Sequence, residues 1–289
     1  MFVSMVREDS MYKIRSHKLA VGQTGVDFVA SPNTGGALDP KFLVIHFTAS
    51  GPSSDIAKYF SNRQAKVSAH VVVRRDGTVI QCVPFNVVAW HAGQSSWTAK
   101  DGGHYTGLNR SAIGIEIENW GPLSKSGSGW VSWTGSAVDA SKVVEARHKN
   151  GGPVRGWETY TDAQIHATID VAQAVCSHYD LTEIIGHDDI SPGRKTDPGP
   201  AWDMSMFKAK VFGREEEGPE VFVVRSPTGL NIRSEPRASA PPLRPVPLAD
   251  GTRVMIHERE GNWRFVSVLN EAGLPDFSGW VHGSYLTEV

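Results

Sequence analysis

The sequence predicts an α/β domain, with a mixed central sheet flanked by helices, followed by a small C-terminal all-β barrel, because three features of the chain agree. Apolar runs bounded by turn residues alternate with helical patterns along most of the 289 residues. The acidic, glycine-flanked segment "GREEEGPE" then interrupts the chain. Short β-rich runs with glycine and proline between them follow, which is typical of a small barrel. We therefore expect one domain at 1–212, with an N-terminal extension at 1–30, a linker at 213–220 and a second domain at 221–289.

The first elements of the larger domain are expected in the order strand, helix and hairpin. "KFLVIHFTAS" is an apolar run bounded by turn residues and predicts a buried strand. Residues 53–65 predict a short helix, with serines as caps before apolar residues at helical spacing. Residues 69–84 predict a β-hairpin that turns at Asp76–Gly77, because this dipeptide tolerates the positive φ of such turns.

Three further elements complete this domain. "SAIGIEIENWG" predicts a strand, and "TEIIGH" predicts a final short one. Between them, residues 159–181 predict a long helix, because Thr161 and Gln164 have capping-box spacing and apolar residues recur behind them at helical intervals. The stretch "GHDDISPGRKTDPGP", residues 186–200, is too rich in glycine and proline for a regular element and too polar for a core. It predicts a stiff loop that holds a ligand.

Composition and charge exclude several classes of protein. The chain is 40% hydrophobic with a net charge of -2 and mixed signs, so it has no broad basic face for nucleic acid. No run of about 18 apolar residues predicts a membrane-spanning segment, and the N-terminus lacks the apolar centre of a signal peptide. Cys82 and Cys176 have no ligand-like spacing and predict two buried thiols. We expect a monomer without a nucleic-acid or membrane partner.

A candidate metal site comes from two histidines and an aspartate. His46 and His187 each end a predicted strand, where side chains converge beyond the edge of a sheet. Asp197 follows in the stiff loop. Two imidazoles and one carboxylate are the ligand set of a catalytic zinc site with an open fourth position, whereas a structural site is usually closed by cysteine. Such an ion can lower the pKa of a bound water to about 7.

Two further charged groups fit hydrolysis at this site. Glu116 and Glu118 lie on one predicted strand, and alternation puts both on the same face, so the pattern does not decide between them as the base. Lys195 stands two positions before Asp197 and could reach the oxygen of a scissile carbonyl. Taken singly, the glutamates fit salt-bridged strand residues and Lys195 a solvated loop lysine. Taken together, the groups predict metal-assisted hydrolysis.

The chain resembles a known family at these residues. "FLVIHFTAS", "AHVVVRRDGTVIQCVP", "AWHAG", "NRSAIGIEIENWG" and "IIGHDDISPGRKTDPGPAW" stand in the order found in the type 2, zinc-dependent N-acetylmuramoyl-L-alanine amidases. The resemblance covers about residues 31–207. It implies the type 2 amidase fold, Zn²⁺ as cofactor, peptidoglycan (glycan strand and stem peptide) as partner, and action at the cell wall. The bond implied is the amide between N-acetylmuramic acid and L-alanine.

The resemblance also assigns roles to individual residues. It implies that His46, His187 and Asp197 bind zinc and that Lys195 stabilises the tetrahedral intermediate. It implies Glu116 as the catalytic acid and base, which is the only ground for choosing it over the second strand glutamate.

Other positions match the family's substrate cleft or depart from its pattern. Trp90 and His91 of the "WHAG" segment, and Asn109, are expected to contact substrate. A branch of the family has a catalytic tyrosine at the position of Ala69, so the glutamate branch is the better match. Residues 120–157 fit the family poorly. Their tryptophans predict an insertion packed onto the body or, alternatively, a platform for sugar stacking.

The C-terminal part resembles bacterial SH3 domains through "GLNIRSEP", "GTRVMIHEREGNWRFV" and "GWVHGSYL". This resemblance implies attachment to the cell wall. Trp280 and Tyr285 are its candidate wall-binding residues, and Trp263 and Trp280 are also expected in the barrel core.

Two alternatives to the amidase remain at this point. One is a non-catalytic peptidoglycan-binding protein, which the complete set of metal ligands, base and lysine disfavours. The other is a metallopeptidase that cuts within the stem peptide, which product analysis separates from an amidase.

Overall fold

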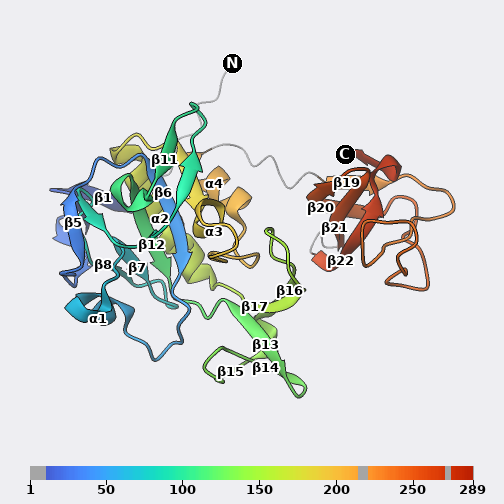
Figure 1. Ribbon diagram of the computed structural model, residues 1–289, viewed down its shortest axis with the longest axis horizontal. Coiled ribbons are helices and arrows are strands. Elements are labelled where there is room, and N and C mark those ends of the chain that lie inside the picture. Colours follow the sequence, from blue (N-terminus) through green and yellow to red (C-terminus); the bar gives the residue numbers. More distant parts are fainter. Residues whose placement is uncertain (1–10, 214–220, 271–274, 289) are drawn as a thin grey trace. The chain divides into compact units, whose positions relative to one another are not determined.

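Figure 1 shows the fold in a computed structural model of the chain, which describes residues 11–213, 221–270 and 275–288. The chain forms two compact units, Met1–Gly213 and Arg214–Val289. All of the predicted linker except Gly213 lies outside the described residues, and so do residues 1–10 of the predicted N-terminal extension.

A six-stranded sheet forms the centre of the first unit, and it is mixed, as predicted. β7 and β8 are antiparallel neighbours, while the other neighbouring pairs are parallel. In their spatial order the strands are β18 (Glu183–Gly186), β6 (Phe42–Phe47), β12 (Ala112–Ile117), β7 (Val71–Val73), β8 (Val79–Gln81) and β4 (Asp27–Phe28). The expected strands and the hairpin at Asp76–Gly77 are therefore confirmed.

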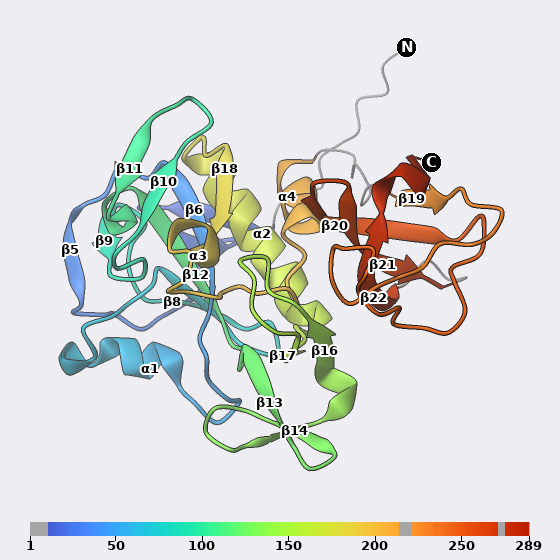
Figure 2. The ribbon, with the colours of Figure 1, turned by 45° about the vertical axis from the view of Figure 1, so that its right-hand side comes forward.

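Two helices cover one face of this sheet. α2 (Asp162–His178) packs beside β7 and β12, and α4 (Met204–Phe212) lies against α2 (Figure 2). α2 begins with the predicted capping box of Thr161 and Gln164, in which each side chain bonds the other residue's backbone amide. The sequence analysis predicted α2 but not α4.

Alternation along β6 assigns its side chains to two faces. Leu43 and Ile45 lie in the same core cluster as Val171 and Val175 of α2. The side chains of a strand point alternately to opposite faces, so His46 projects away from α2. Alternation therefore directs the His46 side chain, at the end of the strand, to the face of the sheet where the candidate site lies.

Two predicted elements differ in detail from the structure. α1 (Ile56–Ser61) is shorter than expected and is capped by Asp55, whose carboxylate accepts from the Lys58 amide, and not by a serine. The stretch 186–200, expected to lack regular structure, contains the single-turn helix α3 (His187–Ile190). The Asp189 carboxylate makes this turn favourable, because it accepts a hydrogen bond from the Gly186 amide at 2.8 Å.

The remaining strands of the first unit form small sheets around the central one. The N-terminal extension is partly integrated, because β4 extends the central sheet. The three-residue turns are η1 (Arg63–Ala65), η2 (Leu108–Arg110) and η3 (Ala140–Lys142). The outer strands are β1 (Tyr12–Arg15), β2 (Lys18–Val21) and β3 (Thr24–Gly25); β5 (Thr34–Ala37) and β9 (Val87–Ala89); and β10 (Ser96–Thr98) and β11 (His104–Thr106).

The segment between β12 and α2 is an insertion with a sheet of its own. Its five strands, in spatial order, are β15 (Ala137–Val138), β14 (Gly129–Val131), β13 (Pro122–Ser126), β17 (Arg155–Glu158) and β16 (Val143–Ala146). Trp130 and Trp157 are buried in it, which confirms packing for two of its tryptophans, but Trp133 is 73% exposed.

The second unit is the predicted β-rich fold. Its five strands, in spatial order, are β22 (Pro275–His282), β21 (Trp263–Leu269), β20 (Arg253–Glu260), β19 (Val221–Val224) and β23 (Leu286–Glu288), with η4 (Gly283–Tyr285) before the last. Trp280 is 4% exposed and packs against Phe265, with ring centroids 5.4 Å apart. Its ring therefore belongs to the core, and its burial does not support the assignment to wall binding. Tyr285 is exposed, and its wall-binding role stays a prediction.

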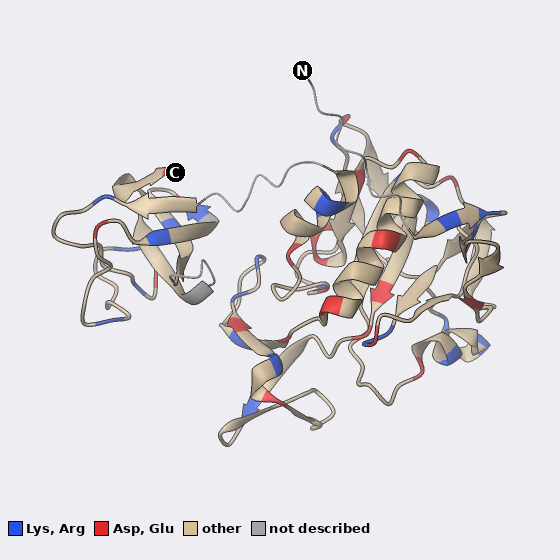
Figure 3. Cartoon of the chain, turned by 180° about the vertical axis from the view of Figure 1, so that it is seen from behind, with Lys and Arg blue, Asp and Glu red and all other residues tan. Residues whose placement is uncertain are grey.

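The surface and the thiols agree with the compositional analysis. Figure 3 shows basic and acidic residues interspersed over the elements of both units. Cys82 and Cys176 are buried and free, as predicted. No helix in the described ranges has the length and apolarity needed to cross a membrane.

Candidate active site

Three neighbouring strands bring the candidate residues to one edge of the central sheet. β6 and β12 are parallel and in register, with Glu116 directly opposite His46. Residues opposite each other in a sheet project from the same face, so both side chains point away from α2. β18 flanks β6 on its other side and ends at Gly186, which places His187 at the same edge. The predicted convergence of strand ends is therefore present.

His46, His187 and Asp197 form a tight, buried cluster. His46 Nδ1, His187 Nδ1 and Asp197 Oδ2 lie 2.9 Å from one another in all three pairings. The three residues are 1%, 2% and 5% exposed. Two tetrahedral ligand atoms, each about 2.0–2.1 Å from a zinc ion, would be about 3.3 Å apart. The three ligand atoms would therefore have to move apart only slightly to bind a small cation.

The outer nitrogens of both histidines determine which ring nitrogen faces the cluster. His46 Nε2 lies 2.9 Å from His91 Nδ1, and His91 Nε2 lies 3.1 Å from the carbonyl oxygen of Ala112. A carbonyl can only accept, so His91 carries its proton on Nε2 and accepts one from His46 Nε2. His187 Nε2 lies 3.2 Å from the carbonyl oxygen of Ala92 and donates to it, and the Arg194 nitrogen 3.4 Å from His187 Nε2 donates instead to the same carbonyl at 2.9 Å. Both inner Nδ1 atoms are therefore unprotonated.

These tautomers favour a cation at the centre of the cluster. Two lone pairs and a carboxylate oxygen face one point, and they would repel one another without a positive charge between them. Burial, followed by repulsion from His187, lowers the pKa of His46 to about 4, so its imidazole is neutral near pH 7 and able to bind a metal. The donor set fits a metal ion, and the outer hydrogen bonds orient the ligands as is usual at such centres.

His91 has a role that sequence analysis did not find. It was expected to contact substrate, but it packs edge-to-face on His46 and hydrogen-bonds to it, so it orients this candidate metal ligand. Its ring lies over Gly114, where a Cβ atom would come within 2.6 Å of it. A glycine inside a strand indicates such a close approach, so this signal was present in "SAIGIEIENWG". Contact between His91 and substrate stays a prediction.

The structure separates the two strand glutamates. Glu116 lines the cleft together with His187, Lys195 and Asp197. Its Oε2 atom is buried and has no hydrogen-bond partner among the described residues. Burial, with the nearby charge of Asp197, raises the pKa of Glu116 well above its usual value, and Lys195 opposes this shift. A buried, unpartnered carboxylate oxygen beside a metal site suits a proton acceptor.

Glu118 lies beyond the end of β12 and serves a structural network. Its carboxylate accepts a hydrogen bond from the Arg75 backbone amide at 3.3 Å. The Arg75 guanidinium forms an ion pair with Glu158 at 2.7 Å, which ties the insertion to the central sheet. Glu118 therefore fits the salt-bridged alternative that the sequence left open for either glutamate.

The other predicted site residues surround the cleft. Lys195 borders both this cleft and an adjoining hollow, where Trp90 and Asn109 also lie. Trp90 is 37% exposed at the junction of the two. The Asn109 side-chain oxygen accepts from the backbone amides of His91 at 3.0 Å and Ala92 at 2.6 Å, so it fixes the loop that orients both histidine ligands. Substrate contacts of Trp90 and Asn109 stay predictions.

Comparison with known families gives two matches. Residues 36–200, more than half of the chain, match the N-acetylmuramoyl-L-alanine amidase family. Residues 228–287 match the bacterial SH3 domain family.

Several characterised proteins are similar to this chain. It is 33% identical over 148 residues to the 1,6-anhydro-N-acetylmuramyl-L-alanine amidase AmpD of Citrobacter freundii, which covers 50% of this chain and 58% of AmpD. It is 34% identical over 182 residues to the N-acetylmuramoyl-L-alanine amidase AmiD of Escherichia coli, which covers 60% of this chain and 54% of AmiD. The chain thus spans little more than half the length of these relatives.

Two solved structures are also similar to this chain. A crystal structure of an AmpD derivative has a TM-score of 0.44 at 27% identity and covers 68% of this chain and 98% of that chain. The complex of E. coli AmiD with anhydro-N-acetylmuramic acid-L-Ala-D-γ-Glu-L-Lys has a TM-score of 0.43 at 27% identity and covers 69% of this chain and 65% of that chain.

Proposed function

Because this chain belongs to the N-acetylmuramoyl-L-alanine amidase family, we propose that it hydrolyses the amide bond between N-acetylmuramic acid and L-alanine in peptidoglycan. One observation supports this proposal above the others. His187 and Asp197 of the metal cluster, the unpartnered carboxylate of Glu116 and the side chain of Lys195 all border one cleft. A protein that only binds peptidoglycan has no need for this combination.

The proposed cofactor is Zn²⁺, held by His46, His187 and Asp197. Two imidazoles and one carboxylate suit this ion and leave a position open for a reactant. When bound, zinc would polarise the scissile carbonyl and increase the acidity of the attacking water.

The protein's own groups would supply the proton transfers. The free oxygen of Glu116 accepts a proton from the attacking water and then returns it to the nitrogen of the leaving L-alanine, because an amine leaves only after protonation. Lys195 borders the same cleft and stabilises the negative charge that develops on the carbonyl oxygen.

The proposal extends to the place of action. We propose that the protein works at the cell wall, that its bacterial SH3 domain attaches it there, and that Tyr285 contributes to this attachment. A single chain supplies every group of the site, so the mechanism needs no second copy.

The first test is digestion of purified peptidoglycan with and without a zinc chelator, followed by mass spectrometry of the soluble products. We expect stem peptides with a free L-alanine amino group, lost on chelation and restored by added zinc. Cleavage inside the stem peptide would instead identify a peptidase. Co-sedimentation with the wall and no released peptide would identify a binding protein.

A further inference from the structure

Residues 148–150 of the insertion between β12 and α2 contact the loop at 186–200. This loop carries His187 and Asp197, and we call it the metal loop. The contacting segment follows β16, and two views show the connection between β16 and β17 next to α3 (Figures 1 and 2). We call residues 148–150 the strap. The strap lies about 40 positions before the residues that it contacts, and neither periodicity nor motif predicted this contact.

The strap makes four polar contacts with two aspartates of α3. His148 Nε2 lies 3.0 Å from Asp188 Oδ2, and Lys149 Nζ lies 2.8 Å from Asp188 Oδ1. Lys149 Nζ also lies 2.6 Å from Asp189 Oδ1, and the Asn150 side-chain amide donates to the Asp188 carbonyl oxygen at 2.9 Å. Every residue of the strap therefore contributes a partner.

The position of Asp188 connects these contacts to the metal ligands. Asp188 directly follows His187, and its backbone amide donates to the Asp197 carbonyl oxygen at 2.8 Å. It therefore links the two ligands that the metal loop supplies. Its side chain is only 3% exposed, so its charge depends on the strap for compensation. A shift of Asp188 would change the spacing of His187 and Asp197.

We propose that the strap is a positioning device for the metal site: Lys149 neutralises Asp188, His148 fixes it through a hydrogen bond, and Asp188 fixes His187 relative to Asp197. The inference rests on the proposed function only in taking the ion to be zinc. The proposal assigns the insertion, which fits the family pattern poorly, a role in retaining the metal ion. Partners behind metal ligands typically contribute about 10–100-fold to metal affinity.

Lys149→Met tests the strap in the full-length chain through zinc affinity, measured by competition with a fluorescent chelator in the absence of substrate. We expect about a tenfold or greater loss, with partial recovery in Lys149→Arg. Glu145→Gln is the matched control, because it removes the exposed ion pair with Lys125 from the same sheet. It should bind zinc as the unchanged chain does.

Two further measurements keep the result interpretable. Thermal unfolding of the metal-free proteins distinguishes a local effect on the site from loss of the fold. Asn150→Ala removes one hydrogen bond to Asp188 and should cause a smaller loss of zinc affinity than Lys149→Met. Unchanged zinc affinity in Lys149→Met, or an equal loss in Glu145→Gln, would overturn the proposal. Failure of the unchanged chain to bind zinc would overturn the proposed cofactor and this inference, whereas zinc binding without amide hydrolysis would affect only the proposed function.

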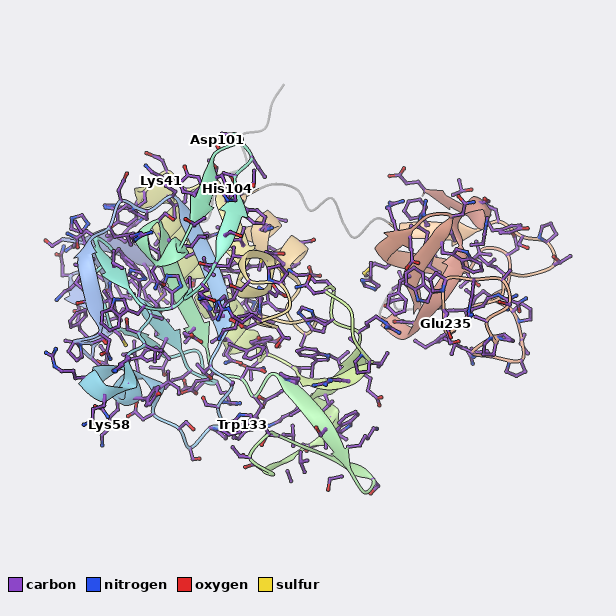
Figure 4. The ribbon with its side chains drawn as sticks, viewed as in Figure 1. Lys41, Lys58, Asp101, His104, Trp133 and Glu235 are labelled. Atoms are coloured by element: carbon purple, nitrogen blue, oxygen red, sulfur yellow. The ribbon has the colours of Figure 1, made fainter. Side chains whose placement is uncertain are left out.

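A second inference rests on a different observation, the exposed indole of Trp133 (Figure 4). Its Nε1–H donates to the carbonyl oxygen of Ala49 at 2.8 Å, although the side chain is 73% exposed. Ala49 lines the cleft that contains Glu116 and has a left-handed backbone with φ 51°. The hydrogen bond therefore holds an open aromatic face at the rim of the cleft.

We infer that Trp133 is a subsite for a sugar ring of the glycan strand next to the scissile muramic acid. This inference deepens the proposed function. Apolar C–H groups of a sugar ring pack on the face of an indole, which is a large apolar surface. A soluble fragment with a single muramic acid has no neighbouring sugar ring to occupy this subsite.

Trp133→Ala is therefore expected to slow digestion of polymeric peptidoglycan about two- to tenfold and to leave turnover of a soluble anhydromuramyl tripeptide unchanged. Trp133→Phe keeps an aromatic ring without the N–H group, so its retained digestion of polymer would assign the effect to stacking. Equal losses on both substrates would show that Trp133 only supports the cleft. If the unchanged chain cleaves neither substrate, the proposed function fails first.

Discussion

Glu116→Gln is expected to bind zinc like the unchanged chain and to hydrolyse the muramyl amide about 10²–10⁴-fold more slowly. Glutamine has nearly the shape of glutamate but does not accept a proton from water at neutral pH. The Glu116 Oε2 atom has no partner among the described residues, so the substitution breaks no hydrogen bond that the fold depends on. The measurement is turnover of a soluble muramyl peptide at equal zinc content.

Glu118→Gln is the matched control for this experiment. It makes the same chemical change two positions along the chain, where the carboxylate interacts with Arg75 outside the cleft. We expect turnover near that of the unchanged chain and a loss of thermal stability, because a largely buried ion pair is weakened. If Glu118→Gln were the inactive variant and Glu116→Gln the active one, the assignment of the base would be wrong.

The pH profile gives an independent readout of the same group. A general base must be deprotonated, so activity should fall as the pH drops through the pKa of Glu116. Burial raises that pKa, so the acid limb should lie above the range of an ordinary glutamate. Glu116→Gln should lose this limb together with the turnover.

Side-chain alternation explains why much of the site was predictable. Strand ends placed His46 and His187 at one edge of the sheet, and the structure has them there with Glu116 directly opposite His46. The same period could not choose between Glu116 and Glu118. That choice depends on tertiary structure: β12 ends at Ile117, and Arg75 of the neighbouring hairpin binds the carboxylate of Glu118.

The parts that could not be predicted depend on contacts between distant segments. His91 was assigned to substrate because its neighbours in sequence suggested a cleft, but its partner His46 lies 45 positions away. The insertion gave no strand pattern, because its strands are short and lie largely at the surface. The strap likewise depends on a pairing of His148 with Asp188, which neither segment indicates alone.

Asp197→Asn is expected to lose zinc binding and, with it, activity. Glu116→Gln, in contrast, is expected to keep the zinc and to lose only the activity. Loss of the only negative ligand should weaken zinc binding at least about 100-fold, beyond the effect of outer partners, and activity should fall with zinc content. The backbone carbonyl of Asp197, which accepts from Asp188, is kept, so the metal loop should stay folded. Zinc titration and circular dichroism measure the two effects.

The melting temperature of the metal-free protein provides a second test of Asp197→Asn. Without a cation, the Asp197 carboxylate faces two unprotonated imidazole nitrogens at 2.9 Å, and its repulsion from them disfavours the fold. An asparagine amide in its place can donate to one of those nitrogens. Metal-free Asp197→Asn should therefore unfold at the same temperature as the metal-free parent or higher, while only the parent gains stability from added zinc, since a ligand stabilises the state that binds it. A lower melting temperature for the metal-free variant would mean that a proton bridges Asp197 and a histidine when the metal is absent.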